Sequence, residues 1–198
     1  MTTTAPAAQL TRLEALRATA SAYPTEPYVV AVGTMVREML LVGRAENHLY
    51  VLDSMGLPPA IGLGLCLGLA ESAHEKVVVI EGDGGMLMGL STLATIGLLQ
   101  PRQLLLVVLD NGVYAATGDQ PTAASAVDFC AAARSCGFKG TWSVATAGEL
   151  QLALAAARRE PGPALLHVRI KAENAPGSYF LPDPVELTLG FQRYLTGK

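Results

Sequence analysis

Residues 76–85 have the sequence Lys-Val-Val-Val-Ile-Glu-Gly-Asp-Gly-Gly, an apolar run rich in β-branched residues that ends at a glycine-rich turn. Residues 103–109, Gln-Leu-Leu-Leu-Val-Val-Leu, form a second apolar run, and Asp110-Asn111-Gly112 follow it. Such runs predict strands that are buried on both faces. The segment between them predicts a helix from about Met86 to Leu99, which Pro101 ends. A strand, a helix and a second strand in this order are typical of a parallel sheet.

The same alternation of strands and helices extends along most of the chain. Further strands are predicted at residues 28–32, 49–52 and 164–170, and further helices at 9–20, 35–41, 58–73, 128–136 and 148–159. Asp183-Pro184-Val185-Glu186 resembles a helix N-cap followed by proline at the first helical position. We therefore expect an α/β fold, with a mostly parallel sheet and helices on both of its faces.

The N-terminal segment is interpreted as a lead-in to this domain. The predicted helix at 9–20 is amphipathic, with leucines near one face and charged residues, Arg12 among them, around the others. Residues 1–22 are expected to form a tail and this lead-in helix. Residues 23–198 are expected to form one binding domain.

Composition excludes several classes of protein. The 14 Lys and Arg residues against 17 Asp and Glu residues give a net charge of −3 without a basic stripe, so no nucleic-acid partner is expected. The uncharged runs Met55–Ala70 and Met86–Gln100 are too short to cross a membrane and predict buried core instead. Met1–Ala8 lacks the charged and apolar parts of a signal peptide. We therefore expect a cytoplasmic protein.

Asp83 and Asn111 each follow an apolar strand, with one helix between the two strands. Right-handed crossovers bring the loops after parallel strands to one carboxyl edge of the sheet, where ligands bind. A carboxylate and a carboxamide oxygen suit Mg2+, which often completes its coordination shell with phosphate oxygens. Gly82, Gly84 and Gly85 let the backbone approach such a ligand, and the start of the next helix favours an anion. The sequence therefore predicts a magnesium and diphosphate site.

Several motifs together resemble those of thiamine diphosphate enzymes. Gly82-Asp83-Gly84 and Asp110-Asn111-Gly112 resemble the fingerprint Gly-Asp-Gly, a helix, a strand and Asn-Asn. Asp53-Ser54-Met55-Gly56 resembles a turn of the decarboxylase-type members, and residues 110–122 resemble a run in phosphonopyruvate and sulfopyruvate decarboxylases. The resemblance covers residues 28–170. It implies the diphosphate-type domain of the thiamine diphosphate-binding fold.

The resemblance implies two cofactors, thiamine diphosphate and Mg2+, and the residues that hold them. The metal ligands would be Asp83, Asn111 and the carbonyl oxygen of Val113. Met55 would support the bent cofactor, while its N–H and the carbonyl of Asp53 would hold the aminopyrimidine ring. The full implied cofactor-binding set is Gly33, Thr34, Asp53, Ser54, Met55, Gly82, Asp83, Gly84, Gly85, Asn111, Val113, Tyr114, Ala115 and Ala116. No catalytic residue is assigned in this chain.

Two positions depart from the family pattern. Asp53 replaces a frequent glycine, but the implied role uses only its main-chain carbonyl, which an aspartate retains if the backbone angles suit it. Asp110 replaces the first Asn of the usual pair, while Asn111, the implied metal ligand, is present. We therefore expect the metal site to survive both changes.

The resemblance also implies a partner. Enzymes of this family build each site between a diphosphate-binding and a pyrimidine-binding domain, and the second supplies an activating Glu. The 198 residues leave room for the first alone, so a separate pyrimidine-binding alpha subunit and a hetero-oligomer are implied. The implied reaction is decarboxylation of a small 2-oxo acid such as sulfopyruvate or phosphonopyruvate. Two alternatives stay open: a carboligase that forms acyloins with the same cofactor, and a non-catalytic cofactor-binding subunit.

Overall fold

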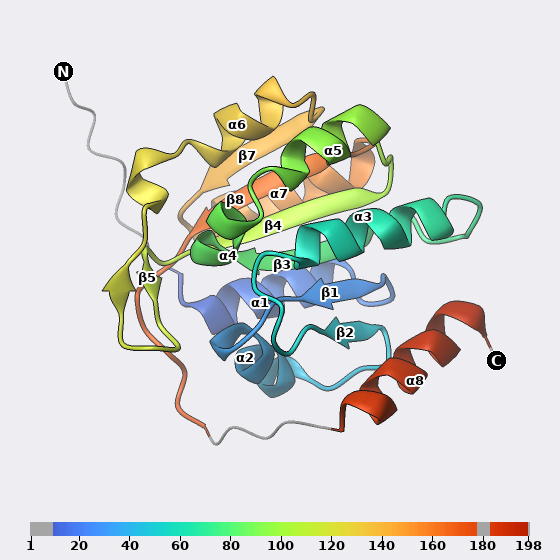
Figure 1. Ribbon diagram of the computed structural model, residues 1–198, viewed down its shortest axis with the longest axis horizontal. Coiled ribbons are helices and arrows are strands. Elements are labelled where there is room, and N and C mark those ends of the chain that lie inside the picture. The colour runs from blue at the N-terminus through green and yellow to red at the C-terminus, as the bar shows by residue number, and fades with distance from the viewer. Residues whose placement is uncertain (1–9, 178–182, 198) are drawn as a thin grey trace.

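Six strands form one parallel sheet in the order β2-β1-β3-β4-β8-β7 (Figure 1). The strands are β1 (Tyr28–Val30), β2 (His48–Tyr50), β3 (Val77–Gly82), β4 (Leu104–Asp110), β7 (Gly140–Val144) and β8 (Ala164–Arg169). The structure, a computed structural model, describes residues 10–177 and 183–197. The predicted α/β class with a mostly parallel sheet is confirmed.

Helices cover both faces of the sheet (Figure 1). On one face lie α1 (Arg12–Ala22), α2 (Thr34–Val42) and α7 (Ala147–Arg159), and on the other lie α3 (Pro58–Gly68), α4 (Asp83–Met88), α5 (Thr92–Leu99) and α6 (Phe129–Ser135). Alternate residues of one strand pack into the two cores: Val78 and Ile80 of β3 face the first, and Val77 and Val79 face the second. The continuous apolar runs of the sequence exist because both faces are buried.

The N-terminal helix packs into the first core. Ala15 and Leu16 of α1 are fully buried there, and Leu10 forms a parallel bridge with Ile170 beyond the end of β8. The expectation that Arg12 lies on a charged outer face is wrong, because Arg12 is only 3% exposed. The separation of residues 1–22 from the binding domain stays a prediction.

The uncharged runs of the sequence form short helices in the second core. The predicted helix at 86–99 is instead two helices, because α4 ends at Met88 and α5 begins at Thr92. At the break, the backbone of Gly89 lies so close to the carbonyl of Gly56 that a Cβ atom would collide with it. The predicted helix at 58–73 also ends early, at Gly68. Within the described residues, no helix has both the length and the apolar character to cross a membrane.

The sequence did not predict three short strands. β7 lies at one edge of the sheet and contains polar residues, as edge strands often do. β5 (Val113–Tyr114) and β6 (Gln120–Pro121) form a separate antiparallel pair after β4. A 3-10 turn at Ala124–Ala126 follows this pair. The hairpin matters for function because it carries Tyr114 and leads to Thr122.

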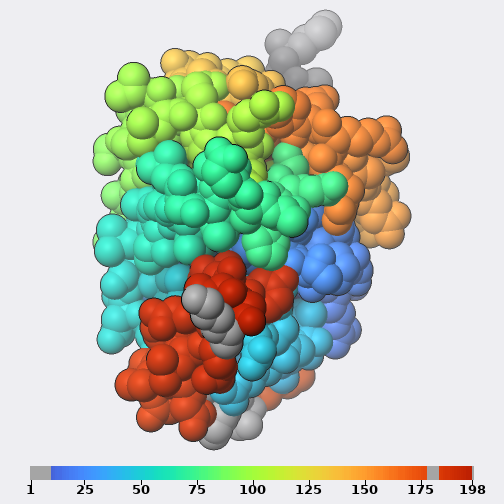
Figure 2. Space-filling view, turned by 90° about the vertical axis from the view of Figure 1, so that its right-hand side faces the viewer, coloured from blue at the N-terminus to red at the C-terminus, as the bar shows by residue number. Residues whose placement is uncertain are grey.

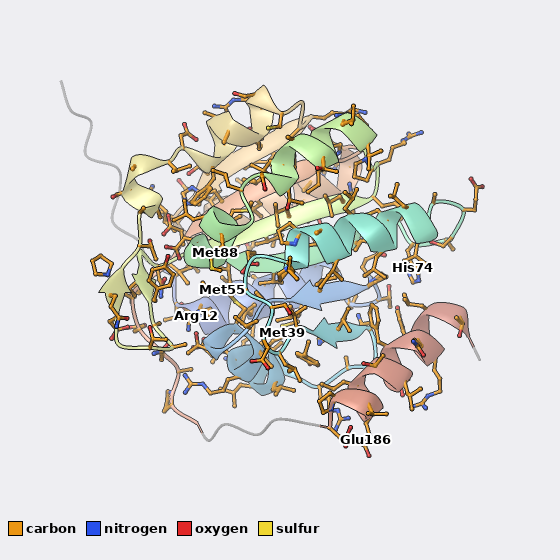
Figure 3. All side chains as sticks on the ribbon, viewed as in Figure 1. Arg12, Met39, Met55, His74, Met88 and Glu186 are labelled. Carbon is orange, nitrogen blue, oxygen red and sulfur yellow. The ribbon has the colours of Figure 1, made fainter. Side chains whose placement is uncertain are left out.

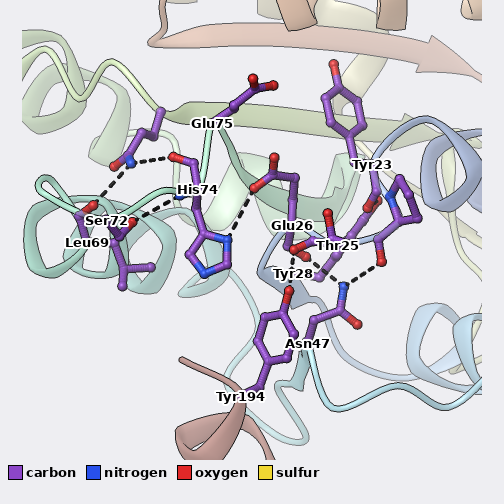
Figure 4. A network of polar contacts seen from close by, with 12 residues as sticks. Tyr23, Thr25, Glu26, Tyr28, Asn47, Leu69, Ser72, His74, Glu75 and Tyr194 are labelled. Carbon is purple, nitrogen blue, oxygen red and sulfur yellow. Dashed lines mark hydrogen bonds and ion pairs between the residues drawn. The ribbon is translucent and has the colours of Figure 1, made fainter. Parts of the chain in front are cut away.

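The C-terminal helix α8 (Pro184–Thr196) packs along β2, at the opposite edge of the sheet from β7. Figure 2 shows α8, in red, on the surface of the molecule. Its expected N-cap is confirmed, since the Asp183 carboxylate accepts hydrogen bonds from Val185 N at 2.7 Å and Glu186 N at 3.3 Å. Near its other end, the Tyr194 hydroxyl donates to the carbonyl of Thr25 (Figure 4). This contact ties α8 to the loop that precedes β1.

Candidate functional site

A cavity of about 120 Å³ lies at the carboxyl edge of the sheet, where the loops after β1, β2, β3 and β4 meet. Twelve of the fourteen expected cofactor-binding residues line it: Gly33, Thr34, Met55, Gly82, Asp83, Gly84, Gly85, Asn111, Val113, Tyr114, Ala115 and Ala116. Asp53 and Ser54 belong to the loop that carries Met55 but do not line the cavity. The main-chain contact expected of Asp53 stays a prediction.

Asp83 is the first residue of α4 and is only 2% exposed. Its carboxylate accepts a hydrogen bond from the Thr122 hydroxyl at 2.5 Å and another from the main-chain N–H of Asn111. Burial raises the pKa of Asp83, and the hydrogen bond from Thr122 opposes that rise. The contact with the Asn111 main chain brings the two expected metal-binding residues into one site.

The turn after β4 explains why Asp110 stands in place of Asn. One carboxylate oxygen, Oδ1, accepts from Gly112 N at 3.0 Å, while Oδ2 lies 2.8 Å from Nε2 of His167. Two separate acceptor oxygens serve two donors, whereas a carboxamide has only one oxygen. Gly112 has φ = +71°, which favours glycine at this turn. The turn is thereby fixed, and Asn111 beside it lines the cavity.

Two glycines keep the floor of the cavity open. A Cβ atom on Gly84 would collide with the ring of Tyr114, and one on Gly85 would collide with the Glu81 carboxylate. In each case the neighbouring side chain would have to move to make room. Close packing therefore favours glycine at both positions.

Glu81 is a buried residue that sequence reasoning did not assign to the site. It is 2% exposed, and its carboxylate accepts from the main-chain N–H groups of Gly82, at 2.9 Å, and Gly56. Burial raises its pKa to about 7, although these two hydrogen bonds lower it. Among the described residues, its Oε2 has no hydrogen-bond partner. A glutamate at the end of an apolar strand, directly before Gly-Asp-Gly, was the available signal.

The turn that carries Met55 is fixed against α4. Gly56 has φ = +82°, and a Cβ atom there would press on Met88 and on the backbone of Gly89. Glu81 accepts a hydrogen bond from the N–H of Gly56 at the same place. Met55 therefore reaches the cavity from a turn that two neighbouring elements hold, which suits a supporting role for its side chain.

Arg12 also lines the cavity, although it belongs to α1 (Figure 3). Its Nη1 donates to Glu38 Oε1 at 2.7 Å and to Asn174 Oδ1 at 2.9 Å. The available signal was helical spacing, since Arg12 lies on the same face as the buried residues Leu16 and Thr19.

The residues present fit a magnesium ion with a diphosphate group. Asp83, Asn111 and Val113 line one cavity, and a carboxylate, a carboxamide oxygen and a main-chain carbonyl are hard oxygen ligands of the kind that Mg2+ binds. The cavity is bounded by glycines 82, 84 and 85, which leave the backbone accessible. A carboxylate next to neutral oxygens leaves room for phosphate oxygens in the coordination shell.

Residues 32–168 match the family described as thiamine pyrophosphate enzyme, C-terminal TPP binding domain. The chain belongs to this family. The match includes every expected metal-binding residue, from Asp83 to Val113. The matched family is a thiamine pyrophosphate-binding domain, which confirms thiamine diphosphate as the expected cofactor.

Relatives of this thiamine pyrophosphate enzyme domain include decarboxylases. Phosphonopyruvate decarboxylase of Streptomyces viridochromogenes is 35% identical, over 96% of this chain and 47% of that protein. Sulfopyruvate decarboxylase subunit beta of Methanococcus maripaludis is 33% identical, over 90% of this chain and 95% of that protein. The resemblance expected from the sequence is thereby confirmed. The chain spans less than half the length of the phosphonopyruvate decarboxylases it matches, 47% and 40%.

Solved structures show the same fold. Benzoylformate decarboxylase of Polynucleobacter necessarius superposes with a TM-score of 0.67 at 23% identity, over 84% of this chain and 33% of that chain. A thiamin diphosphate-dependent enzyme of Mycobacterium smegmatis gives a TM-score of 0.68 at 22% identity, over 82% of this chain and 32% of that chain. These likenesses confirm the thiamine diphosphate-binding fold expected for the chain.

Proposed function

We propose that this chain is the diphosphate- and Mg2+-binding subunit of a thiamine diphosphate-dependent 2-oxo acid decarboxylase built from two kinds of subunit. Its substrate is a small 2-oxo acid of the sulfopyruvate or phosphonopyruvate type. The observation that carries the proposal is the convergence of Asp83, Asn111, Val113 and Met55, from three loops, on one glycine-lined cavity. Relatives named for both decarboxylases support the substrate class.

In this proposal each residue has a defined task. Asp83, Asn111 and the Val113 carbonyl hold Mg2+, and the cofactor's diphosphate binds to that ion. Thr122 fixes the Asp83 carboxylate through its hydroxyl. Met55 supports the bent form of the cofactor from a turn that Glu81 and α4 hold. When bound, the cofactor supplies the nucleophilic carbon and the electron sink that decarboxylation of a 2-oxo acid requires.

A second subunit is part of the proposal. The cavity of about 120 Å³ is small beside the roughly 300–1,000 Å³ of ordinary ligand pockets, as expected for half of a shared site. Two relatives with similar lengths are named subunit beta. Among the described lining residues, the acids are Glu81 and Asp83; Glu81 accepts from Gly82 N, and Asp83 accepts from the Thr122 hydroxyl. The proposal assigns the glutamate that activates the aminopyrimidine ring to an alpha subunit.

A mixing experiment tests this proposal. The purified chain is assayed for CO2 release from sulfopyruvate and from phosphonopyruvate, with thiamine diphosphate and Mg2+, alone and with a candidate pyrimidine-binding chain. We expect activity only in the mixture, and its loss when the partner's activating Glu is replaced by Gln. Release of CO2 by this chain alone would contradict the two-subunit proposal. Conversion of an added aldehyde to an acyloin, with CO2 still released from the 2-oxo acid, would identify a carboligase. Cofactor binding without CO2 release or acyloin would identify a non-catalytic subunit.

A further inference from the structure

Arg12 brings a positive charge to the cavity. Of the described residues that line the cavity, three are charged, and the other two, Glu81 and Asp83, are acidic. Arg12 is the first residue of α1, where a cation opposes the helix dipole, so helix formation does not explain its position. It is nonetheless 97% buried, at a place where an unpaired charge is costly.

The hydrogen bonds of Arg12 leave part of its guanidinium available. Both bonds, to Glu38 and to Asn174, use Nη1. In the part of the chain that the structure describes, Nε and Nη2 have no acceptor, and neither is a fully buried atom without a partner. Arg12 is one of the residues that line the cavity. A guanidinium edge with two free donors matches the oxygens of a phosphate or sulfonate group.

Arg12 shares its buried carboxylate partner with a second arginine. Glu38 is 1% exposed and lies 2.7 Å from Arg12 and 3.8 Å from Arg37. Two guanidinium groups therefore share one carboxylate. Asn174 connects the cluster to the cavity wall, because its Nδ2 lies 3.5 Å from the carbonyl of Ala115. An anion in the cavity would complete this cluster.

We propose that Arg12 binds a tetrahedral oxyanion in the cavity, of the phosphate, phosphonate or sulfonate class. Two groups in the proposed reaction have this chemistry: the terminal phosphate of the cofactor and the second acidic group of the substrate. The inference rests on the proposed function and deepens it. It assigns anion recognition to α1, which packs beside the cofactor-binding loops and is not one of them.

The test compares two arginines of the same cluster. In Arg12→Gln, the charge that faces the cavity is removed, whereas Arg37→Gln removes the neighbouring charge that does not line it. For the full chain with its partner, calorimetry gives the affinity for thiamine diphosphate with Mg2+, and kinetics give KM for sulfopyruvate and for pyruvate. We expect Arg12→Gln to weaken the binding of one anion by about tenfold or more. Arg37→Gln should weaken the same binding by less than about threefold.

The measurements identify which oxyanion is bound. If Arg12 binds the cofactor, the affinity for thiamine diphosphate falls in Arg12→Gln. The kinetics with sulfopyruvate and with pyruvate then change by the same factor. If it binds the substrate, cofactor affinity is retained and KM rises for sulfopyruvate but not for pyruvate. Unchanged values for both, or equal losses in both variants, would overturn the inference. Failure of the wild-type complex to bind thiamine diphosphate would instead overturn the proposed function.

A second variant covers loss of folding. Breaking a buried ion pair on one side leaves an unpaired charge, so Arg12→Gln alone can unfold the chain. In the double variant Arg12→Gln/Glu38→Gln, both charges are removed and two carboxamides can pair in the same space. The double variant should show the same loss of anion affinity. Wild-type affinity in the folded double variant would overturn the inference.

Discussion

Polar side chains have different surroundings at the two ends of the sheet. At the amino end, side chains are bonded to the main chain of neighbouring loops: Asn47 Nδ2 donates to the carbonyl of Glu26 at 2.8 Å (Figure 4), and Gln103 Nε2 donates to that of His74 at 2.7 Å. At the carboxyl end, Asp83 and Asn111 line a cavity bounded by glycines. The first arrangement fixes loops, and the second lines a cavity that suits a ligand. Substitutions at the two ends should therefore affect different quantities.

The largest effect is expected at Asp83. Asp83→Ala removes the charged metal ligand, so the affinity for thiamine diphosphate with Mg2+ should fall by more than about 100-fold, beyond the usual effect of outer-shell substitutions. Stability should change little, because burial already disfavours the charged carboxylate. Calorimetry measures the affinity, and circular dichroism monitors the fold.

The matched control is Asp128→Ala. Asp128 caps α6 by accepting from Ala131 N at 2.8 Å and does not line the cavity. Its loss should lower stability by about 1 kcal/mol and leave cofactor affinity unchanged. Equal cofactor affinities in wild type and Asp83→Ala would remove the metal site from its proposed place.

The next effect is acid sensitivity at the amino end, where β2 begins at His48. Burial lowers the pKa of His48 from 6.5 to about 4. Between these values the unfolded chain binds more protons, so stability should fall as the pH falls from 6.5 to 4, by about 3 kcal/mol in total. Tyr28 and Tyr50 pack on the ring, and Arg44, Glu186 and Arg193 line the adjoining cavity. Urea unfolding across this range measures the slope.

The comparison variant is His48→Gln, which keeps a polar group near the Tyr50 hydroxyl, 3.0 Å from Nδ1 in the native chain. The stability of this variant should decrease much less between pH 6.5 and 4 than that of the wild type. If its pH profile matched that of the wild type, the acid sensitivity would come from other groups.

A smaller effect is expected at Asn47. Asn47→Ala removes donors to the carbonyls of Glu26, at 2.8 Å, and Pro24, at 3.3 Å, inside the protein. Each lost hydrogen bond costs about 1 kcal/mol, so unfolding free energy should fall by about 2 kcal/mol. Cofactor affinity per folded molecule should stay as in the wild type. A loss of affinity would show that the two ends of the sheet are coupled.

Features that depend on neighbours in sequence were predictable. The apolar runs gave β3 and β4, and the glycine-rich and Asp-Asn turns at their ends placed Asp83 and Asn111 at one edge. Parallel crossovers determine this convergence once the strands are recognised. Most of the candidate site was therefore accessible from the sequence.

Features that depend on distant contacts were not predictable. Helix 86–99 breaks because Gly89 packs on Gly56, a contact that no helical period records. Arg12 is buried because its partners, Glu38 and Asn174, come from α2 and from the segment after β8. Glu81 has a similar explanation, since its acceptor role includes Gly56 from another loop. In each case the missing information is which loops meet.

A smaller loss of stability than at Asn47, together with a loss of cofactor affinity, is expected at Gly84, which tests the open carboxyl end. Its φ lies in the ordinary range, so Gly84→Ala acts through space alone, by placing a methyl group against the Tyr114 ring. We expect a loss of about 1–2 kcal/mol in stability and about tenfold in cofactor affinity. Gly64→Ala is the control, because open space surrounds Gly64 and alanine favours a helix. In Gly84→Ala/Tyr114→Ala the clash is absent, so the two substitutions should couple favourably, and additive effects would show that the methyl group disturbs something other than Tyr114.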